Sequence, residues 1–284
     1  MAGGERIFVQ AIRRYCARHD IGCDVRAGGW LIAMRRGETR RFAFGYDIGL
    51  NSAIAHRIAN DKSATAEALS LQRVPCIPHH LFLNPKLGET IVGAGWRGAM
   101  LGLLHDNPQG VVVKPNEGTS GRSVFKVTTE SELDHAVGEV FSMSAGLVIS
   151  PYVVIEDEVR VVLLDGVPFV VYSKQRGPDW RHNLDAGAKP VLLQDGEVRT
   201  ACVKLATDAA NAIGIRFASI DVVRVDGVWR VLEINSGVMM ESLAKLHPEL
   251  VQATYDAALD RVFGNAESHN STQVPHPPLE GEGR

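Results

Sequence analysis

The sequence predicts a mixed fold of the α+β class, and two pairs of strand-like runs indicate antiparallel sheets. Residues 221–225 and 228–234 alternate apolar and polar side chains on either side of Asp226-Gly227, a pattern typical of a β-hairpin. Two further apolar runs, residues 111–113 and 124–127, flank a glycine-rich loop. Segments with apolar residues at helical spacing surround both pairs, so the same chain provides helices as well as hairpins.

The first part of the chain predicts helices around three short strands. The expected elements are a helix at 7–19, strands at 22–25, 30–35 and 40–44, and helices at 51–59 and 64–71. The first helix is amphipathic, and glycine-bearing turns separate the strands. Pro75 and Pro78 end the last of these helices and begin an extended connection.

The middle of the chain predicts strands and one helix before a long polar loop. The expected elements are strands at 111–113, 124–127, 147–154, 159–164 and 168–173, and a helix at 131–142. Ser131 and Asp134 resemble a capping box, with Asp where Glu or Gln is usual. Residues 175–190 are polar and rich in Gly, Arg and Asn, so we expect function to explain this loop.

The last part of the chain predicts helices on both sides of the Asp-Gly hairpin. We expect a helix at 200–213 that ends at Gly214, a residue suited to a helix C-terminus. A final helical region at 243–263 is interrupted near Pro248. The tail at 265–284 is expected to be disordered.

Composition excludes several classes of function. The chain has 284 residues, 45% of them hydrophobic, which is enough for one or two domains. A formal net charge of −3 gives no reason to expect a nucleic acid or an anionic membrane as partner. The sequence shows neither a bilayer-spanning apolar window nor a signal peptide. Its four scattered cysteines indicate reduced thiols in a cytoplasmic protein, without a zinc site or disulfides.

The ends of the hairpin carry the residues best suited to hold a metal ion. Asp221 opens the first strand, and Glu233 and Asn235 close the second. A hairpin brings its strand ends together, and residues two apart on a strand share a face. Two carboxylates and an amide oxygen are hard ligands that suit Mg²⁺ beside nucleotide phosphates. The alternative is a hairpin that merely has polar ends.

A lysine and a glycine loop form a second candidate site. Lys114 ends one apolar run and is followed by a loop containing Gly118, Thr119, Ser120 and Gly121. Backbone N–H groups of such a loop can surround phosphate oxygens while lysine supplies a positive charge. The Walker and Gly-x-Gly-x-x-Gly patterns are absent. Taken alone, the loop can be an ordinary hairpin turn, and Lys62 a solvated helix residue.

Arginines form a third candidate site. Arg160 lies inside an otherwise apolar strand, where an unpaired charge is costly. Arg176, Arg181 and Asn183 follow in the polar loop. Guanidinium groups bind carboxylates and phosphates through two hydrogen bonds, so arginines near a metal site indicate anionic substrates or intermediates. The alternative for Arg176 and Arg181 is a solvated surface loop.

Together these motifs resemble the ATP-grasp superfamily, and within it the branch of glutathione synthetases and RimK-type glutamate ligases. The resemblance covers residues 55–245 and rests on the order and spacing of the motifs. The motifs are Asn60-Asp61-Lys62, Val74-Pro75-Cys76-Ile77-Pro78, Val113-Lys114-Pro115 with its glycine loop, residues 149–153, residues 158–166, Arg176, residues 181–187, Asp221 and Glu233-Ile234-Asn235.

The resemblance implies an ATP-grasp fold, in which two α+β subdomains clasp the nucleotide after a reduced N-terminal α/β domain. It divides the chain into an N-terminal region at 1–60, a small subdomain with a glycine-rich flap at 61–150, a catalytic subdomain with the magnesium site at 151–264, and the tail at 265–284.

The resemblance also implies ATP, two Mg²⁺ ions (or Mn²⁺), and a role for each candidate residue. Lys62 and Lys114 would contact the α- and β-phosphates, and Lys114 would also lie near the adenine. The other implied nucleotide contacts are the flap residues 118–123, Pro151, Tyr152 and Val153 in the hinge, and Glu158 at the ribose hydroxyls. The implied metal ligands are Asp221, Glu233 and Asn235. The residues implied to steady the γ-phosphate and the acyl-phosphate are Arg160, Arg176, Arg181 and Asn183.

Three departures from the family pattern bear on the substrate. Ser150-Pro151 stands where the hinge usually carries Gln or Glu, although the Pro151 carbonyl can still accept a hydrogen bond from adenine. The family commonly has a proline soon after Asn235, whereas residues 236–241 contain none. The region before Lys62 is also shorter than in glutathione synthetases, which suits a larger substrate.

The activity implied is that of an ATP-dependent carboxylate–amine ligase acting on a small-molecule or peptide carboxylate and an amine, in a chain that can be a homo-oligomer. The carboxylate would attack the γ-phosphate, and the amine would then displace phosphate from the acyl-phosphate. No protein nucleophile is needed, so His79, His80 and His182 are interpreted as structural histidines. Two alternatives are a small-molecule kinase on the same scaffold and a non-catalytic nucleotide- or partner-binding module.

Overall fold

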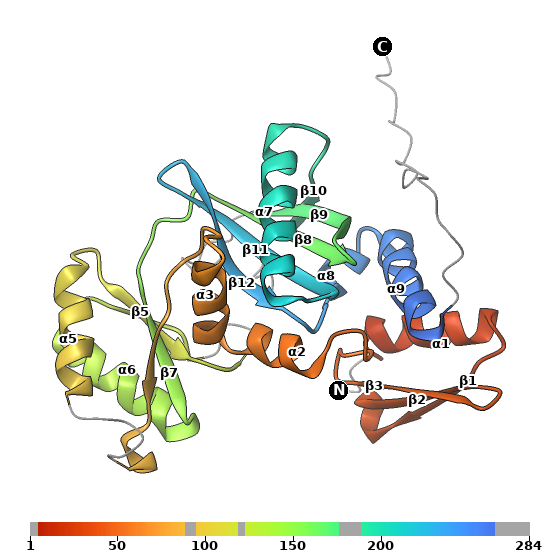
Figure 1. Ribbon diagram of the computed structural model, residues 1–284, viewed down its shortest axis with the longest axis horizontal. Coiled ribbons are helices and arrows are strands. Elements are labelled where there is room, and N and C mark those ends of the chain that lie inside the picture. Colours follow the sequence, from red (N-terminus) through yellow and green to blue (C-terminus); the bar gives the residue numbers. More distant parts are fainter. Residues whose placement is uncertain (1–4, 89–94, 119–122, 176–188, 265–284) are drawn as a thin grey trace.

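The computed structural model describes residues 5–88, 95–118, 123–175 and 189–264, and their strands form three antiparallel sheets (Figure 1). The sheets have the orders β1-β2-β3, β10-β9-β8-β11-β12 and β4-β7-β5-β6. In Figure 1 the five-stranded sheet lies in the middle, between the four-stranded sheet on the left and the three-stranded sheet on the right.

The five-stranded sheet is covered by helices on both faces. Its strands are β8 Asp157–Leu164, β9 Val167–Gln175, β10 Lys189–Leu192, β11 Phe217–Val225 and β12 Val228–Asn235. Successive side chains alternate between the two faces, and β8 and β11 are buried along almost their whole length. One face packs against three helices through a core that includes Val161, Ala206 and Ile220. The helices are α2 Ala53–Asn60, α3 Lys62–Leu71 and α7 Glu197–Ile213.

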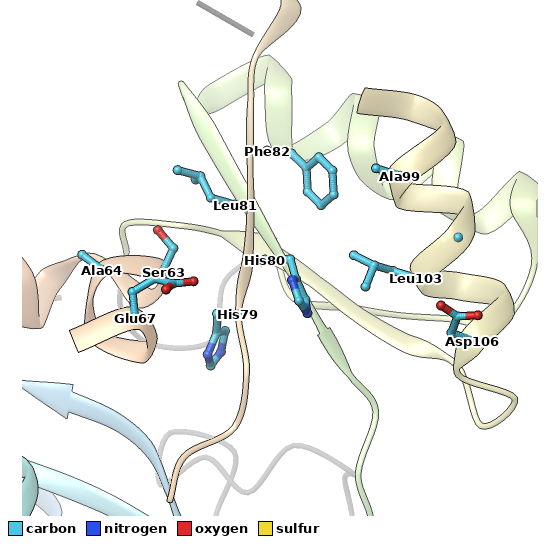
Figure 2. Close-up of a pocket in the computed structure, with 11 residues that line it drawn as sticks. Ser63, Ala64, Glu67, His79, His80, Leu81, Phe82, Ala99, Leu103 and Asp106 are labelled. Carbon is cyan, nitrogen blue, oxygen red and sulfur yellow. The ribbon is translucent and has the colours of Figure 1, made fainter. Parts of the chain in front are cut away.

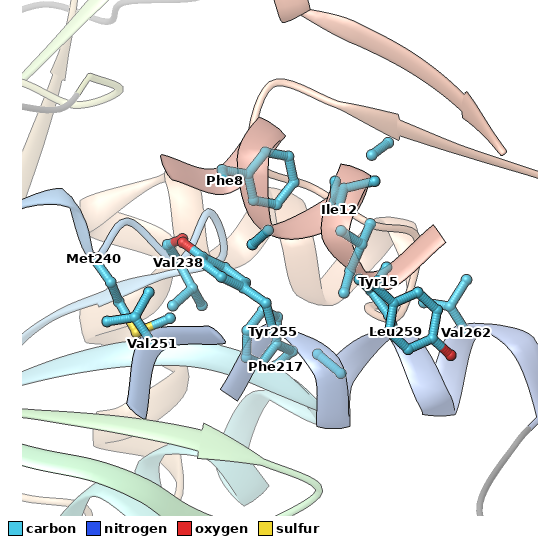
Figure 3. Packing of buried hydrophobic residues seen from close by; sticks show 14 of the residues in the cluster. Phe8, Ile12, Tyr15, Phe217, Val238, Met240, Val251, Tyr255, Leu259 and Val262 are labelled. Carbon is cyan, nitrogen blue, oxygen red and sulfur yellow. The ribbon is translucent and has the colours of Figure 1, made fainter. Parts of the chain in front are cut away.

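The opposite face of this sheet shares its core with the two ends of the chain. The elements concerned are α1 Ile7–Arg18, β1 Gly22–Arg26, β2 Leu31–Arg36, β3 Thr39–Phe44, α8 Glu241–Ala244 and α9 Pro248–Phe263. Figure 3 shows Phe8 and Ile12 of α1 beside Tyr255 and Leu259 of α9, with Phe217 of β11 beneath them. Because these apolar side chains come from both ends of the sequence, α1 and α9 stabilise each other across one core.

The four-stranded sheet carries helices on one face. Its strands are β4 His80–Leu83, β5 Val111–Pro115, β6 Phe125–Val127 and β7 Gly146–Pro151, and its helices are α5 Trp96–Asp106 and α6 Glu130–Met143. Met100 and Leu104 of α5 and Leu133 of α6 pack onto Val111 and Val113 of β5. Short 3-10 turns occur at Ala27–Gly29 and Pro85–Leu87.

Two segments connect the four-stranded sheet with the rest of the chain, and both are hydrogen-bonded to the central hairpin. The Ile77 N–H donates to Val231 O, and the Val231 N–H donates to Pro75 O, each at 2.9 Å. In the second segment the Glu156 N–H donates to Arg224 O at 2.9 Å. A small apolar cluster fills the space beside both attachments: Ile77, Val153, Ile155, Val223, Val225 and Leu232.

Most of the predicted elements are present, and the differences have local causes. The capping box of α6 was predicted at Ser131 and Asp134, which is wrong. It is formed by Thr129, which accepts from the Glu132 N–H, and by the Glu132 carboxylate, which accepts from the Thr129 N–H. The strand predicted at 147–154 ends at Pro151. The elements β4, α5 and β10 were not predicted. The division of the chain at residues 60 and 150 stays a prediction, and the tail at 265–284 lies outside the described residues.

Candidate active site

The hairpin brings the three predicted metal ligands together. Asp221 of β11 lies directly opposite Glu233 of β12, and Asn235 is two residues further along the same face. Asn235 Nδ2 donates to Glu233 Oε1 at 3.2 Å. The turn that sets this register has φ values of 50° at Asp226 and 73° at Gly227, as a type I′ hairpin turn requires. Two carboxylates and an amide therefore share one face of the central sheet.

Two cations from neighbouring strands neutralise Asp221. Arg160 of β8 donates from Nε and Nη2 to the two carboxylate oxygens of Asp221 at 2.7 and 2.6 Å. Lys174 of β9 lies with Nζ 3.0 Å from Asp221 Oδ2 and 2.5 Å from Glu158 Oε1. Asp221 and Lys174 have side chains only 1% and 5% exposed. The four groups form a buried network with two positive and two negative charges.

Burial acts on every charge in this network, and the ion pairs oppose it. Burial would raise the pKa of Asp221, but Arg160 and Lys174 outweigh it and hold that pKa well below its ordinary value. Burial would likewise lower the pKa of Lys174, yet Asp221 beside it leaves that pKa raised. For Glu158 burial prevails over Lys174 and raises the pKa to about 7. Asp221 is thus the permanent anion of the network, and Glu158 is the group poised to gain a proton.

Two lysines lie near Glu233: Lys114 on β5 of the four-stranded sheet, and Lys62 at the start of α3. Lys62 begins α3 and donates from Nζ to the carbonyls of Asn116 and Gly118 at 3.3 and 3.0 Å. Burial lowers the pKa of Lys62, and burial lowers that of Lys114 to about 8, while Glu233 opposes the shift at both. Since Glu233 acts on the charge of both lysines, the hairpin and the lysines share one site.

Asn116 fixes the start of the glycine loop to the start of α3. Its side-chain oxygen accepts from the Ser63 N–H at 3.0 Å, and its amide nitrogen donates to Asp61 Oδ2 at 2.7 Å. Asp61 in turn caps α3 by accepting from the Ala64 N–H at 2.8 Å. The backbone N–H of Lys62 donates to Asn116 O at 3.2 Å. These bonds explain why Lys62 and β5 are held together although they lie far apart in sequence.

The predicted hinge leaves β7 opposite the start of β5, whereas Lys114, near the other end of β5, pairs with Val148. Pro151 is the last residue of β7 and pairs with Val111 of β5. The Tyr152 N–H donates to Gly110 O at 3.0 Å, so this donor is already used within the protein. Val153 packs in the small apolar cluster between the connecting segments. The assignment of these residues to adenine, and of Glu158 to ribose, stays a prediction.

Six of the predicted site residues lie outside the described residues: Thr119, Ser120, Gly121, Arg176, Arg181 and Asn183. Gly118, at the start of the flap, is described and has φ 137°, a value that favours glycine.

Sequence reasoning missed Lys174 and gave His79 only a structural role. Lys174 lies two residues after buried Tyr172 on β9, so both side chains are on the same face of the strand. A lysine in a strand of mostly apolar residues indicates a buried charge that needs a partner. His79 is buried, its Nδ1 lies 2.9 Å from Ile77 O, and its Nε2 has no hydrogen-bond partner in the described part of the chain. Burial and the nearby Lys114 keep the His79 pKa well below its ordinary value, so this ring is neutral.

An open cleft of about 540 Å³ lies beside this site rather than within it (Figure 2). Figure 2 shows Ser63 and Glu67 of α3 on one side of the β4 segment and Leu103 and Asp106 of α5 on the other. None of the carboxylates or cations of the Asp221 network lines this cleft. The charged cluster, not this open cleft, is therefore the candidate site.

The donor chemistry of the hairpin fits a hard divalent cation. No group of three or more His, Cys, Asp and Glu side chains suited to a metal occurs in the ranges that the structure describes. The hairpin instead combines two carboxylates with the amide oxygen of Asn235, all of them oxygen ligands of the type Mg²⁺ prefers. Glu233 forms no ion pair within these ranges, whereas both Asp221 oxygens contact cations.

The comparison with known families now decides the identity. A family model described as the RimK-like ATP-grasp domain matches residues 105–250, about half of the chain. The chain belongs to the RimK-like ATP-grasp family. The matched part contains Lys114, Arg160, Lys174, Asp221 and Glu233, so the charged cluster lies in the RimK-like region.

Solved structures confirm the ATP-grasp fold of this RimK-like chain. The D-alanine–D-alanine ligase from Bacillus anthracis aligns with a TM-score of 0.57 at 21% identity, covering 75% of this chain and 69% of that one. The ATP-grasp ligase PsnB, solved with a minimal precursor, aligns with a TM-score of 0.53 at 18% identity, covering 74% and 63%.

Curated relatives match over parts of their length. A probable alpha-L-glutamate ligase of Haemophilus ducreyi is 24% identical over 197 residues, which are 69% of this chain and 60% of that protein. D-alanine–D-alanine ligase A of Bacillus cereus is 25% identical over 161 residues, 54% of this chain and 53% of that protein. The RimK-like chain thus spans about half to 60% of the length of these two relatives. No helix in its described part combines the length and apolarity needed to cross a bilayer.

Proposed function

We propose that this protein is an ATP-dependent carboxylate–amine ligase that forms an amide bond through an acyl-phosphate. The observation that carries the proposal is the meeting of two opposed groups of charges. Lys114 lies on β5 of the four-stranded sheet, Lys62 of α3 is bonded to the loop that follows β5, and Glu233 of the central hairpin acts on both. An ATP-grasp fold holds a nucleotide between two subdomains, and the two curated relatives described above are named as ligases.

The lysines supply the charge that a polyphosphate needs. Both have pKa values lowered by burial, and neither has a carboxylate within ion-pair distance in the described part of the chain. A phosphate placed between them would restore the charge balance, because an anion favours the protonated form of each lysine. Asn116 and Gly118, at the start of the glycine loop, both accept from Lys62, so the position of this lysine depends on that end of the loop.

The Asp221 network supplies charge where the acyl-phosphate forms. Arg160 is bound to Asp221 through two hydrogen bonds, which fixes the plane of its guanidinium group. Lys174 is held by two carboxylates in the same way. Fixed positive charges in a buried site stabilise a moving phosphoryl group without reorganising during the reaction. Arg176, Arg181 and Asn183 are proposed to complete this part of the site.

We propose that Asp221, Glu233 and Asn235 hold two Mg²⁺ ions, with Mn²⁺ as a substitute. When bound, Mg²⁺ would neutralise phosphate charge and orient the triphosphate. Glu233 is available to bind a cation, since it forms no ion pair in the described part of the chain and its carboxylate accepts from the Asn235 amide. Asp221 can join it with lone pairs that Arg160 and Lys174 leave unused, or by releasing one of these partners.

The substrates proposed are a small-molecule or peptide carboxylate and an amine. Neither a nucleic acid nor a membrane is needed for this reaction, and a homo-oligomer is compatible with it. We propose a cytoplasmic location, because ATP is supplied there and the four cysteines are free thiols.

The test is an acyl-phosphate trap. The protein is incubated with ATP, Mg²⁺ and a panel of amino acids and short peptides, with hydroxylamine as the amine, and hydroxamate and ADP are measured. A ligase forms one hydroxamate for each ADP. A kinase would instead leave a stable phosphorylated product without any amine, and a binding module would bind ATP and release no ADP with any substrate.

Two variants and a control assign the reaction to the site. Glu233→Ala and Asp221→Ala should each abolish hydroxamate formation. Glu139→Ala, on the exposed side of α6, removes a carboxylate far from the cluster and should leave the rate unchanged. Undiminished turnover in both site variants would show that the hairpin does not hold the metal.

A further inference from the structure

The outer side of the N-terminal sheet carries side chains that the fold does not use. Within β2 and β3 the residues Ile32, Met34 and Ala43 face the core. The alternate residues face away from it and form three cross-strand pairs: Leu31 with Phe44, Ala33 with Phe42, and Arg35 with Arg40. We call these six residues, together with Trp30, the aromatic–arginine face. In Figure 1 this sheet lies below α1, with its second side turned away from the molecule.

The apolar half of this face is unusually open. Phe42 and Phe44 are 58% and 62% exposed, and Trp30 beside them is 49% exposed. The Trp30 and Phe44 rings meet edge to face with centroids 6.3 Å apart. Arg6 covers one face of the Trp30 ring, at 4.7 Å from its centroid. Phe42 and Phe44 share one face of β3, and Trp30 contacts Phe44, so three exposed aromatic side chains gather at one place. Exposed apolar patches mark interaction sites.

The two arginines of this face lower the stability of the folded sheet. Arg35 and Arg40 lie directly opposite each other, and like charges in that position destabilise a sheet. Arg35 donates only to Gly37 O, and neither guanidinium has a carboxylate partner in the described ranges. The nearby Asp24 is already paired with Arg26 at 2.8 Å. An arrangement that costs stability and exposes aromatic rings is explained if something binds there.

We propose that the aromatic–arginine face docks an acidic polypeptide segment with apolar or aromatic side chains. The carboxylates would bind to Arg35 and Arg40, which lie opposite each other on the two strands, because guanidinium groups bind carboxylates through paired hydrogen bonds. The apolar side chains would cover Phe42 and Phe44. Aromatic residues and arginine are the types that dominate protein–protein contacts.

Other occupants fit the face less well. In a two-fold dimer through this face, the same patch meets itself and four arginines would gather without an acid. A single-stranded nucleic acid needs a basic track along its backbone, but only two arginines are unpaired here and the chain carries a net charge of −3. Anionic membranes bind clusters of four or more basic residues, which this face also lacks.

The experiment is a selection followed by a binding measurement. Random twelve-residue peptides displayed on phage are selected on the full chain, and fluorescein-labelled copies of the enriched peptides are titrated by anisotropy. We expect enriched peptides to combine Asp or Glu with Phe, Trp, Tyr or Leu. Arg35→Glu/Arg40→Glu and Phe42→Ser/Phe44→Ser should each weaken binding at least tenfold, with the melting temperature measured for every variant.

A matched control and three other probes make the outcome decisive. Arg57→Glu/Arg73→Glu changes the net charge equally on exposed residues elsewhere and should leave binding within about twofold. Arg40→Glu alone would oppose Arg35 with an acid, so weaker binding without a lower melting temperature separates docking from folding. The proposal fails if enriched peptides lack acids, if the control weakens binding equally, or if the face instead binds labelled dT12, phosphatidylserine vesicles or a second copy seen by light scattering. The readout is binding, so it is independent of the ligase reaction.

Discussion

The two sides of the active site balance their charges differently. On the central sheet, Asp221 is neutralised by Arg160 and Lys174 within 3.0 Å. Around the loop that follows β5, Lys62 and Lys114 are half-buried, form no ion pair in the described part of the chain, and have pKa values lowered by their burial. The first group is complete without a ligand, and the second lacks an anion. Under the proposed function, the central sheet would hold catalytic charge in place, and the lysines would receive phosphate.

The largest effect should follow removal of the anion from the complete group. Asp221→Ala leaves Arg160 and Lys174 buried beside each other without their shared carboxylate, so we expect a loss of about 3–5 kcal/mol in the free energy of unfolding. Urea denaturation measures it. As a control, Arg216→Ala breaks the exposed pair with Asp165 and should cost less than about 1 kcal/mol. Equal losses in the two variants would contradict the contrast between buried and exposed pairs.

For Lys114, which lacks an anionic partner within ion-pair distance in the described part of the chain, we expect a substitution to raise the free energy of unfolding rather than lower it. Burial holds the pKa of Lys114 at about 8 rather than 10.5, so at pH 7 the folded protein carries a charge that the unfolded chain accommodates better. Lys114→Met should therefore raise stability by on the order of 2 kcal/mol while weakening ATP binding roughly 10- to 100-fold. Calorimetry and thermal unfolding measure the two effects, and a less stable Lys114→Met protein would refute the assignment.

A smaller effect tests how Lys62 is placed. Asn116→Leu keeps the size of the side chain but removes the acceptor of the Ser63 N–H and the donor to Asp61. We expect a loss of about 1–3 kcal/mol in stability, since buried polar groups lose their partners, and weaker ATP binding because the flap is no longer fixed to α3. Asn107→Leu, which removes a side-chain bond to Leu103 O on α5, is the control and should leave ATP affinity unchanged.

The mildest change is a change of pH. In the nucleotide-free protein Lys114 loses its proton near pH 8, and the phosphates of bound ATP raise that pKa. Binding then takes up a proton above pH 8, so ATP affinity should be constant below it and fall by at most about tenfold per pH unit above it. Calorimetry in buffers of different ionisation enthalpy detects this proton. Lys114→Arg should bind without that pH dependence.

The sequence was most informative where local chemistry decides structure. An Asp-Gly pair between alternating runs has few structures available, so the register that joins Asp221 to Glu233 was predictable. The helix end at Gly214 followed from the left-handed backbone there, with φ 66°. The capping box was wrong by two residues because Ser131 and Asp134 have the same spacing as Thr129 and Glu132, which are the pair that forms it.

The features that the sequence did not predict depend on contacts between segments that are distant in the chain. The role of Lys174 is visible only in the folded sheet, where β9 pairs with β8 and β11 lies next to β8. Its partners Glu158 and Asp221 come from β8 and β11. The first helix and the last one share a core that neither predicts by itself. The β4 strand is recognisable only through its pairing with β7, since its four residues carry no alternation of their own.

The two attachments of the connecting segments have a consequence for motion. One lies where Ile77 bonds to Val231 and the other where Glu156 bonds to Arg224, near opposite strands of the same hairpin. The line through these two hydrogen-bonded points is the expected hinge axis. The bonds from Asn116 to Ser63 and Asp61 at the start of α3 form a third attachment. Once these bonds break, the four-stranded sheet should rotate about that line and resist twisting or sliding. Opening for nucleotide exchange would then carry Lys114 directly away from Glu233 along one arc, with the apolar cluster at Ile77 as the pivot.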